Sequence, residues 1–162
     1  MKILFDTDIG SDIDDALALL LLLHLPQVEL LGVTTVYGQV DIRAKVARRI
    51  LDSAGVAVPV VMGESQPIHS PMPVWHAGTE GRGVLTAEDV AAPLERFNMS
   101  DGADEFIIEM IDANPGEVII ASLGALTNIA RAVRHRPDIH SGGLRGLHAI
   151  ERILDRQACL CR

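Results

Sequence analysis

The segment Phe5-Asp6-Thr7-Asp8-Ile9-Gly10-Ser11-Asp12-Ile13-Asp14-Asp15-Ala16 places five carboxylates within ten consecutive residues. A short apolar run, residues 3–5, precedes the cluster, and a longer one, residues 16–23, follows it. The first run predicts a buried strand and the second a buried helix. The acidic cluster then forms the turn between the carboxyl end of a strand and the amino end of a helix. Open α/β sheets bind their ligands at that place.

Five carboxylates this close together repel one another, and some would take up protons unless a cation neutralised them. A hard divalent cation with oxygen ligands, Ca²⁺ or Mg²⁺, meets this need. The alternative is a solvated acidic loop in which Asp12 or Asp14 caps the helix. We favour the metal site, because a helix cap uses one or two acids and five are present.

The composition of the chain argues against several classes of function. The chain has 162 residues, enough for one domain, and its formal net charge of −8 argues against a nucleic-acid-binding surface. The longest apolar stretch, residues 16–23, is too short to span a bilayer, and the first strand starts too early for a signal peptide. The two cysteines, Cys159 and Cys161, form no disulfide framework. We therefore expect a cytoplasmic protein without membrane or nucleic-acid partners.

The remaining sequence alternates between strand and helix patterns. Strands are expected at residues 2–5, 28–36, 58–62 and 117–122. Helices are expected at residues 14–25 and 41–54, after a cap at Ser100, and between Gly124 and Pro137. This alternation predicts a three-layer α/β domain with a mainly parallel sheet.

Three local patterns lead to further expectations. Helix 14–25 is apolar nearly all round, so we expect it to be covered on both sides. In helix 41–54, the basic side chains of Arg43, Lys45, Arg48 and Arg49 are expected to face largely away from the core. Residues 64–98 are expected to be an irregular loop, and a loop this long is usually functional.

A parallel sheet brings the carboxyl ends of its strands to one edge. Four turns should therefore meet there: residues 6–15, Tyr37-Gly38-Gln39, Gly63-Glu64 and Leu123-Gly124. The loop that contains His76 is expected to cover them. The sequence thus predicts an acidic, metal-binding site at this edge.

Several of these segments resemble the nucleoside hydrolases of the inosine–uridine-preferring family, which open with an Asp-x-Asp-Pro-Gly-x-Asp-Asp-like motif after the first strand. The matching segments are Asp6-Thr7-Asp8-Ile9-Gly10-Ser11-Asp12-Ile13-Asp14-Asp15, Val33-Thr34-Thr35-Val36-Tyr37-Gly38, Pro59-Val60-Val61-Met62-Gly63, His76-x-Gly78 and Leu123-Gly124-Ala125-Leu126-Thr127-Asn128-Ile129-Ala130. The resemblance covers roughly residues 2–139. It divides the chain into a hydrolase-like α/β domain, residues 1–139, and an atypical C-terminal tail, residues 140–162.

The resemblance implies a Rossmann-like sheet and a Ca²⁺-dependent hydrolase of the N-glycosidic bond of ribonucleosides, acting as a homo-oligomer. By position, Asp8 and Asp15 would bind Ca²⁺ together with the backbone carbonyl of Leu123, and Asp8 would also be the general base. Asp14, Gln39 and His76 would bind the substrate. Asp6 and Asp12 are possible further site residues.

The chain departs from the family in ways that affect these expectations. Ile9 replaces the motif's proline, Gln39 replaces an asparagine, and two extra residues leave open whether Asp12 or Asp14 holds ribose. Family members are also considerably longer, and their C-terminal part supplies another calcium-binding aspartate and residues around the nucleobase. We therefore expect a fold that is truncated or frame-shifted after about residue 139, and an impaired activity.

Two other functions remain open from the residues alone. Asp6-x-Asp8 after a first strand is also the arrangement of a haloacid-dehalogenase-like phosphatase, with one aspartate as nucleophile, the other as acid, and Mg²⁺. The second alternative is a non-catalytic fragment or interaction module that keeps the amino part of the fold.

Overall fold

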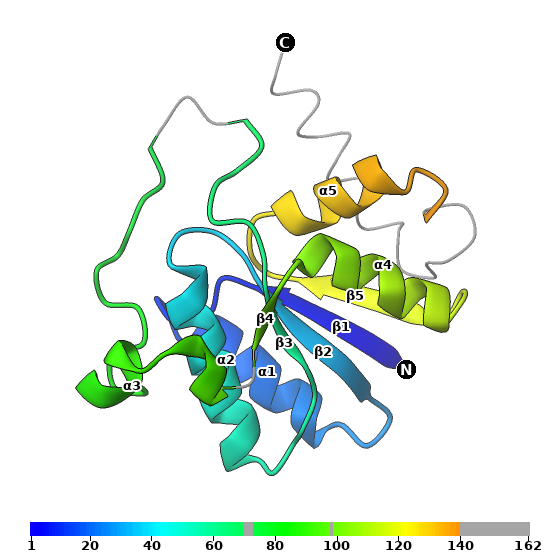
Figure 1. Ribbon diagram of the computed structural model, residues 1–162. Coiled ribbons are helices and arrows are strands. Elements are labelled where there is room, and N and C mark those ends of the chain that lie inside the picture. The colour runs from blue at the N-terminus through cyan, green and yellow to red at the C-terminus, as the bar shows by residue number, and fades with distance from the viewer. Residues whose placement is uncertain (70–72, 98, 140–162) are drawn as a thin grey trace.

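The computed structural model describes residues 1–69, 73–97 and 99–139, and these alternate between strands and helices (Figure 1). The strands are β1 (Lys2–Thr7), β2 (Glu29–Thr35), β3 (Val60–Met62), β4 (Ser100–Asp101) and β5 (Val118–Ser122). The helices are α1 (Asp14–His24), α2 (Val40–Ser53), α3 (Ala87–Ala91), the 3₁₀ helix η1 (Leu94–Phe97), α4 (Ala103–Ala113) and α5 (Thr127–His135).

The strands form one parallel sheet in the order β4-β3-β2-β1-β5. Chain order runs outward from β1 through β2 and β3 on one side, whereas β5 pairs with β1 on the other side. The strand order therefore reverses at the β1–β5 pair, and a crevice at the carboxyl ends of such a pair is the usual ligand site of an open α/β sheet.

Helices cover both faces of the sheet, with α1 and α2 on one side and α4 and α5 on the other (Figure 1). Neighbouring residues of β1 point to opposite faces, as the two-residue period of a strand requires. Leu4 packs with Ile107 and Ile129 on the α4–α5 side, and Phe5 packs with Leu19 and Val46 on the α1–α2 side. The predicted three-layer α/β architecture with a parallel sheet is confirmed.

Two predictions between residues 64 and 103 were wrong. Ser100 does not cap a helix: Ser100 and Asp101 pair with Val61 and Met62 as β4, and Gly102 precedes α4 with a φ of 93°. A two-residue strand is too short to show a sequence period. The second wrong prediction is that residues 64–98 form an irregular loop. They contain α3 and η1, and α3 begins at a capping box formed by Thr86 and Asp89.

The prediction that α1 is covered on both sides was also wrong for the described residues. Leu19 is fully buried, but Ile13, Leu17 and Leu21 are 71%, 56% and 60% exposed. The helix packs against the sheet and α2 on one side, and no other described element covers its outer side. No helix in the described ranges is long and apolar enough to cross a membrane.

The basic residues of α2 do not face away as predicted. Arg43, Lys45 and Arg48 are buried and only Arg49 is exposed. Lys45 Nζ donates to the carbonyls of Val90 (2.9 Å) and Ala92 (2.8 Å), in the segment that folds over α2. Backbone carbonyls from neighbouring segments thus satisfy the charged ends, so these long side chains remain inside.

Candidate active site

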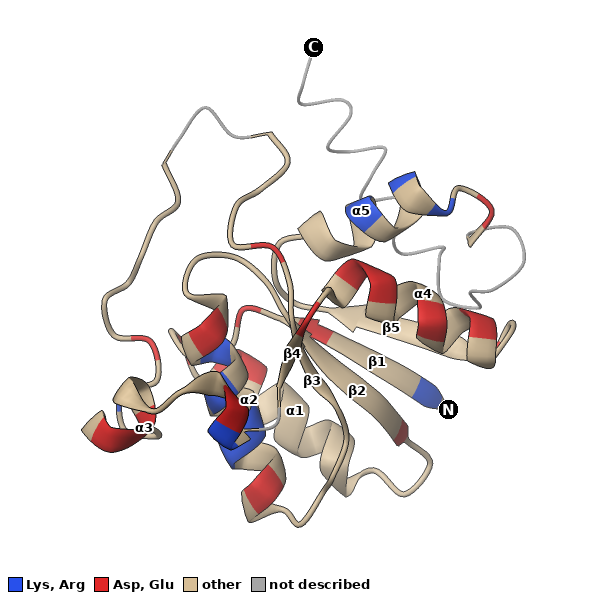
Figure 2. Ribbon diagram, in the orientation of Figure 1, with Lys and Arg blue, Asp and Glu red and all other residues tan. Residues whose placement is uncertain are grey.

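Backbone hydrogen bonds join the loops at the carboxyl edge of the sheet. Val36 N donates to Thr7 O (3.0 Å), Leu123 N to Asp6 O (2.9 Å) and Tyr37 N to Glu64 O (2.8 Å). The loops after β1, β2, β3 and β5 therefore meet, as the sequence predicts. Figure 2 shows acidic residues at this edge, near the end of β1 and the start of α1.

Asp6, at the carboxyl end of β1, is fully buried and holds this edge together. Its carboxylate accepts hydrogen bonds from Thr34 Oγ1 (2.6 Å), Asn128 Nδ2 (2.8 Å) and Ser122 Oγ (3.2 Å). Burial raises the pKa of Asp6 to about 6, against the effect of these three hydrogen bonds, and the charge of Asp8 adds to the rise. These three hydrogen bonds from β2, β5 and α5 make Asp6 an anchor of this edge.

Asn128 is a site residue that the sequence pattern did not indicate, although it lies inside one of the segments quoted above. Its amide donates to Asp6 and to Thr35 O (3.1 Å), and its Oδ1 accepts from Glu64 N (2.9 Å). Gly63 approaches so closely that any Cβ there would overlap the Asn128 amide. Asn128 therefore connects β1, β2 and the loop after β3.

Asp15 is 7% exposed, lies in the first turn of α1, and accepts a hydrogen bond from Thr7 Oγ1. Burial raises its pKa, the Thr7 hydrogen bond opposes this, and the negative charges of Asp8 and Asp14 add to the rise. Asp8 and Asp14 therefore lie within electrostatic range of Asp15. The capping alternative is not supported, because the cap residue is Ile13 and no side chain makes a cap hydrogen bond.

Asp8 lies against the loop after β5. A Cβ on Gly124 would be 2.9 Å from Asp8 N and 3.2 Å from Asp8 Oδ1. Leu123, the neighbouring residue, is 45% exposed at the same place. At the carboxyl end of the β1–β5 pair, Asp8 thus lies beside Gly124 and acts electrostatically on Asp15. Asp8, Asp15 and the carbonyl of Leu123 remain the predicted metal donors.

These donors provide only part of a metal site. Oxygen ligands suit a hard cation such as Ca²⁺, which takes six to eight of them. Within the described ranges, however, His, Cys, Asp and Glu side chains form no group of three or more that could hold a metal ion. The fit is therefore limited to Asp8, Asp15 and a backbone carbonyl.

Arg43 of α2 reaches into the acidic loop, and the sequence analysis missed this. Its Nη1 donates to the carbonyls of Asp8 and Ile9 (3.0 Å for Ile9) and to Ser11 Oγ (3.2 Å), and its Nε donates to Tyr37 O (2.7 Å). The chain's own cation therefore relieves part of the charge crowding that the sequence shows. Distant loops create this contact, so the local pattern of α2 held no signal for it.

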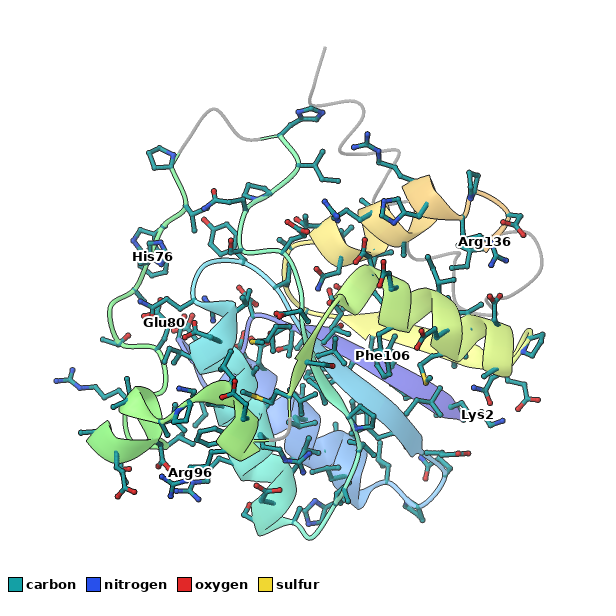
Figure 3. All side chains as sticks on the ribbon, viewed as in Figure 1. Lys2, His76, Glu80, Arg96, Phe106 and Arg136 are labelled. Carbon is teal, nitrogen blue, oxygen red and sulfur yellow. The ribbon has the colours of Figure 1, made fainter. Side chains whose placement is uncertain are left out.

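The segment after β3 covers the Tyr37–Gly38 turn. Trp75 N donates to Tyr37 Oη (3.0 Å), and a Cβ on Gly38 would lie 3.5 Å from His76 Nδ1. Figure 3 shows His76 and Glu80 on this same segment. His76 is exposed, as is Gln39, which follows Gly38 and precedes α2. The predicted loop residue His76 is thus placed beside the turn that carries Gln39.

Asp12 and Asp14 are separated by the fold. Both are exposed, but Asp12 lines a cavity of about 380 Å³ on the outer side of the acidic loop, together with Arg82 and Val84. Asp14 instead acts electrostatically on Asp15. A larger cavity of about 600 Å³ lies near Pro59 and contains none of the candidate site residues. Asp14 thus acts on the buried Asp15, whereas Asp12 lines this cavity; which of the two would hold ribose stays a prediction.

Comparisons with known proteins identify relatives of the chain. The chain is 38% identical over 146 residues to the inosine-uridine preferring nucleoside hydrolase of Leishmania major, covering 85% of this chain and 44% of that protein. It is 36% identical over 136 residues to uridine nucleosidase 1 of Arabidopsis thaliana, covering 82% and 40%. These curated relatives are thus more than twice as long as the segment that matches them.

A comparison with solved structures also finds a hydrolase of ribonucleosides. The purine-preferring ribonucleoside hydrolase of Gardnerella vaginalis superimposes with a TM-score of 0.69 at 28% identity, covering 86% of this chain and 45% of that one. Neither comparison supports the phosphatase alternative. The model of the inosine-uridine preferring nucleoside hydrolase family matches residues 3–145, and the chain belongs to this family.

Proposed function

We propose that the chain hydrolyses the N-glycosidic bond of ribonucleosides at the β1–β5 crevice, with Asp8 as the general base. The observation that carries this proposal is the position of Asp8, which lies against Gly124 and acts electrostatically on the buried Asp15 at the switch in strand order. Membership of the family supports the reaction class.

Asp8, Asp15 and the carbonyl of Leu123 are proposed to hold Ca²⁺. The bound ion would lower the pKa of a coordinated water and orient it. Asp8 then accepts a proton from the attacking water. Asp14 and Gln39, which are both exposed, are proposed to bind ribose hydroxyls, and His76, which lies beside Gly38, is proposed to contact the substrate. The surrounding carboxylates favour the positive charge that develops on the sugar, as in glycoside hydrolysis generally.

Departure of the nucleobase is the more demanding half of the reaction. A poor leaving group needs protonation or a stabilising pocket. The chain matches 40% of the length of the Arabidopsis relative and 44% of the Leishmania relative, so hydrolysis of natural nucleosides is a proposal for this chain.

Ribose release from a nucleoside mixture, with Ca²⁺ or with EDTA, tests the function directly. Asp8→Asn is expected to reduce the rate at least 100-fold, because a base contribution of this order is typical. The matched control is Asp12→Asn, which changes an exposed aspartate outside the crevice and is expected to stay within two-fold. Phosphate release from p-nitrophenyl phosphate, without ribose release, would favour the phosphatase instead.

We also propose that copies of the chain associate. Ile13, Leu17 and Leu21 form an exposed apolar stripe on α1, and surfaces of this kind mark interaction sites. A cytoplasmic location remains a prediction from the sequence.

A further inference from the structure

Arg43 is the bulkiest of the side chains that are almost fully buried, with 2% exposure. A buried guanidinium is costly unless its N–H groups and its charge find partners. The partners of Arg43 belong to loops of the candidate site and not to its own helix.

The first two loops are joined by the planar guanidinium itself. Its Nη1 donates to the carbonyls of Asp8 and Ile9, and its Nε donates to Tyr37 O (2.7 Å). The hydrogen bond to the Asp8 carbonyl holds the peptide between Asp8 and Ile9 in place. It therefore also restrains the Asp8 Cα, from which the side chain projects. Tyr37 has a φ of 68°, the only positive value among the described non-glycine residues, and such a conformation persists only where the surroundings hold it.

The third loop is the segment that carries His76 and Glu80 (Figure 3). Glu80 Oε1 accepts from Ala77 N (2.9 Å), while its Oε2 is buried and makes no hydrogen bond within the described part of the chain. Burial works to raise the pKa of Glu80, but hydrogen bonds from the backbone of Glu80 and Ala77 and the charge of Arg43 hold it below its ordinary value.

The same segment is tied to the acidic loop by Gly81 N, which donates to Gly10 O (2.9 Å). Gly38 lies beside both this segment and the guanidinium: a Cβ on Gly38 would lie 3.5 Å from His76 Nδ1 and 3.8 Å from Arg43 Nη2. The guanidinium therefore lies where all three loops meet.

We propose that Arg43 is a positioning residue that couples the Asp8 loop, the Tyr37–Gly38 turn and the His76–Glu80 segment, so that releasing the guanidinium loosens all three together. Arg43 acts through the Asp8 peptide and through the charge of Glu80, without touching the substrate. The consequence for metal binding rests on the proposed function; the coupling itself does not.

Arg48 provides a matched control in the same helix. It is also buried, at 8% exposure, and its guanidinium donates to the carbonyls of Val56 (2.6 Å) and Val58 (2.8 Å). These carbonyls precede β3, at the end of the sheet opposite to the acidic loop. A merely structural buried arginine should therefore behave like Arg48.

Amide hydrogen exchange on the full chain in EDTA, followed by mass spectrometry, separates the two roles. Each segment concerned contains hydrogen-bonded amides, among them Ile9, Tyr37 and Gly81. Arg43→Met should accelerate exchange at least ten-fold in residues 8–11, 37–39 and 77–85 together, with residues 55–58 within two-fold. Arg48→Met should show the reverse pattern.

Arg43→Lys is the second variant, and it also serves if Arg43→Met does not fold. One ammonium cannot replace the fork of a guanidinium, so Lys should leave at least two of the three segments exchanging faster than in the wild type. A change confined to residues 8–11, or a uniform increase like that of global unfolding, in the folded variant would overturn the coupling.

Calorimetric titration with Ca²⁺ is the second readout. Arg43→Met should weaken binding at least ten-fold and Arg48→Met less than two-fold. Equal losses in both variants would show that Arg43 acts on metal binding only through stability, and would overturn its positioning role. A wild-type chain that binds no Ca²⁺ would instead count against the proposed function, and the exchange pattern would still decide the coupling.

Discussion

Thr34 Oγ1 donates a hydrogen bond of 2.6 Å to the carboxylate of Asp6 across the β1–β2 pair, inside a fully buried site. Burial nevertheless raises the pKa of Asp6 to about 6, from an ordinary value of 3.8. The folded chain therefore binds more protons than the unfolded chain between these two values. The stability that Asp6 contributes is full below about pH 4 and is lost as the pH rises through about 6.

This loss of stability with rising pH gives a prediction for Asp6→Asn, whose side chain does not titrate. In urea unfolding with EDTA present, the free energy of unfolding of the wild type minus that of the variant should fall by roughly 2.5 kcal/mol between pH 4 and 7. The pKa of Asp89 is lowered to about 2 by its Thr86 hydrogen bonds and by Arg49. Its contribution to the pH dependence of stability is the same in both proteins, so it cancels from the difference. A difference that does not vary with pH would contradict the assignment of the raised pKa to Asp6.

Calcium binding is expected to depend on Asp8 and Asp15, because both are proposed ligands and the charge of Asp8 acts on the Asp15 carboxylate. Calorimetry should show binding that weakens at least ten-fold in Asp8→Ala and in Asp15→Ala. Asp12→Ala is the control, since Asp12 lines the outer cavity, and it should change the affinity less than two-fold. Unchanged binding by the Asp8→Ala, Asp15→Ala double variant would refute the ligand assignment.

Gly124→Ala tests the close approach of the β5 loop to Asp8. The new Cβ would lie 2.7 Å from Val36 Cγ1 and 2.9 Å from Asp8 N, so the Asp8 backbone must shift. We expect a loss of stability of about 1–3 kcal/mol and at least a ten-fold loss of Ca²⁺ affinity.

Gly116→Ala is the matched control for Gly124→Ala. Its Cβ would meet no atom within 4 Å, but its φ of 70° strains an alanine. It should therefore lose about 1–2 kcal/mol of stability without any change in Ca²⁺ affinity. Parallel losses of affinity in both variants would show that Ca²⁺ binding follows overall stability and not the position of Asp8.

The exposed stripe on α1 predicts self-association. Light scattering at increasing concentration should show dimers or larger species, and Leu17→Glu with Leu21→Glu should shift them towards monomer. Val90→Glu is the control, because Val90 is 47% exposed on α3, away from the stripe. A monodisperse wild-type monomer over the whole range would contradict the proposal.

The parts of the fold that were predictable from sequence have periodic patterns. The apolar runs of β1, β2 and β5 and the strand–helix alternation were enough to predict the parallel sheet and the acidic turn at its edge. β4 was not predictable, because two residues show no period. The sequence expectation for α1 was wrong for a different reason: an apolar surface indicates that cover is favourable, but not that a covering element exists.

The site was predictable where it lies in one segment and not where it depends on distant contacts. The carboxylates of residues 6–15 were identified because they are adjacent. The bond between Asp6 and Asn128 joins residues 122 apart, and the bonds from Arg43 cross from α2 to two other loops. An arginine on a helix is expected to face solvent, and only the carbonyls that the loops bring to it reverse that expectation.

The last prediction concerns the leaving group. Asp8, Asp14 and Asp15 are proposed to supply the base, the ribose contact and the metal ligand, which together serve the attack of water. Departure of a natural base also needs protonation or a stabilising pocket, whereas p-nitrophenolate leaves with little help. The chain should therefore cleave p-nitrophenyl riboside detectably faster than inosine or uridine. Asp8→Asn should abolish the cleavage of both kinds of substrate, because both require the base. Rapid turnover of inosine or uridine by these 162 residues would show that the assistance to the leaving group is already present within them.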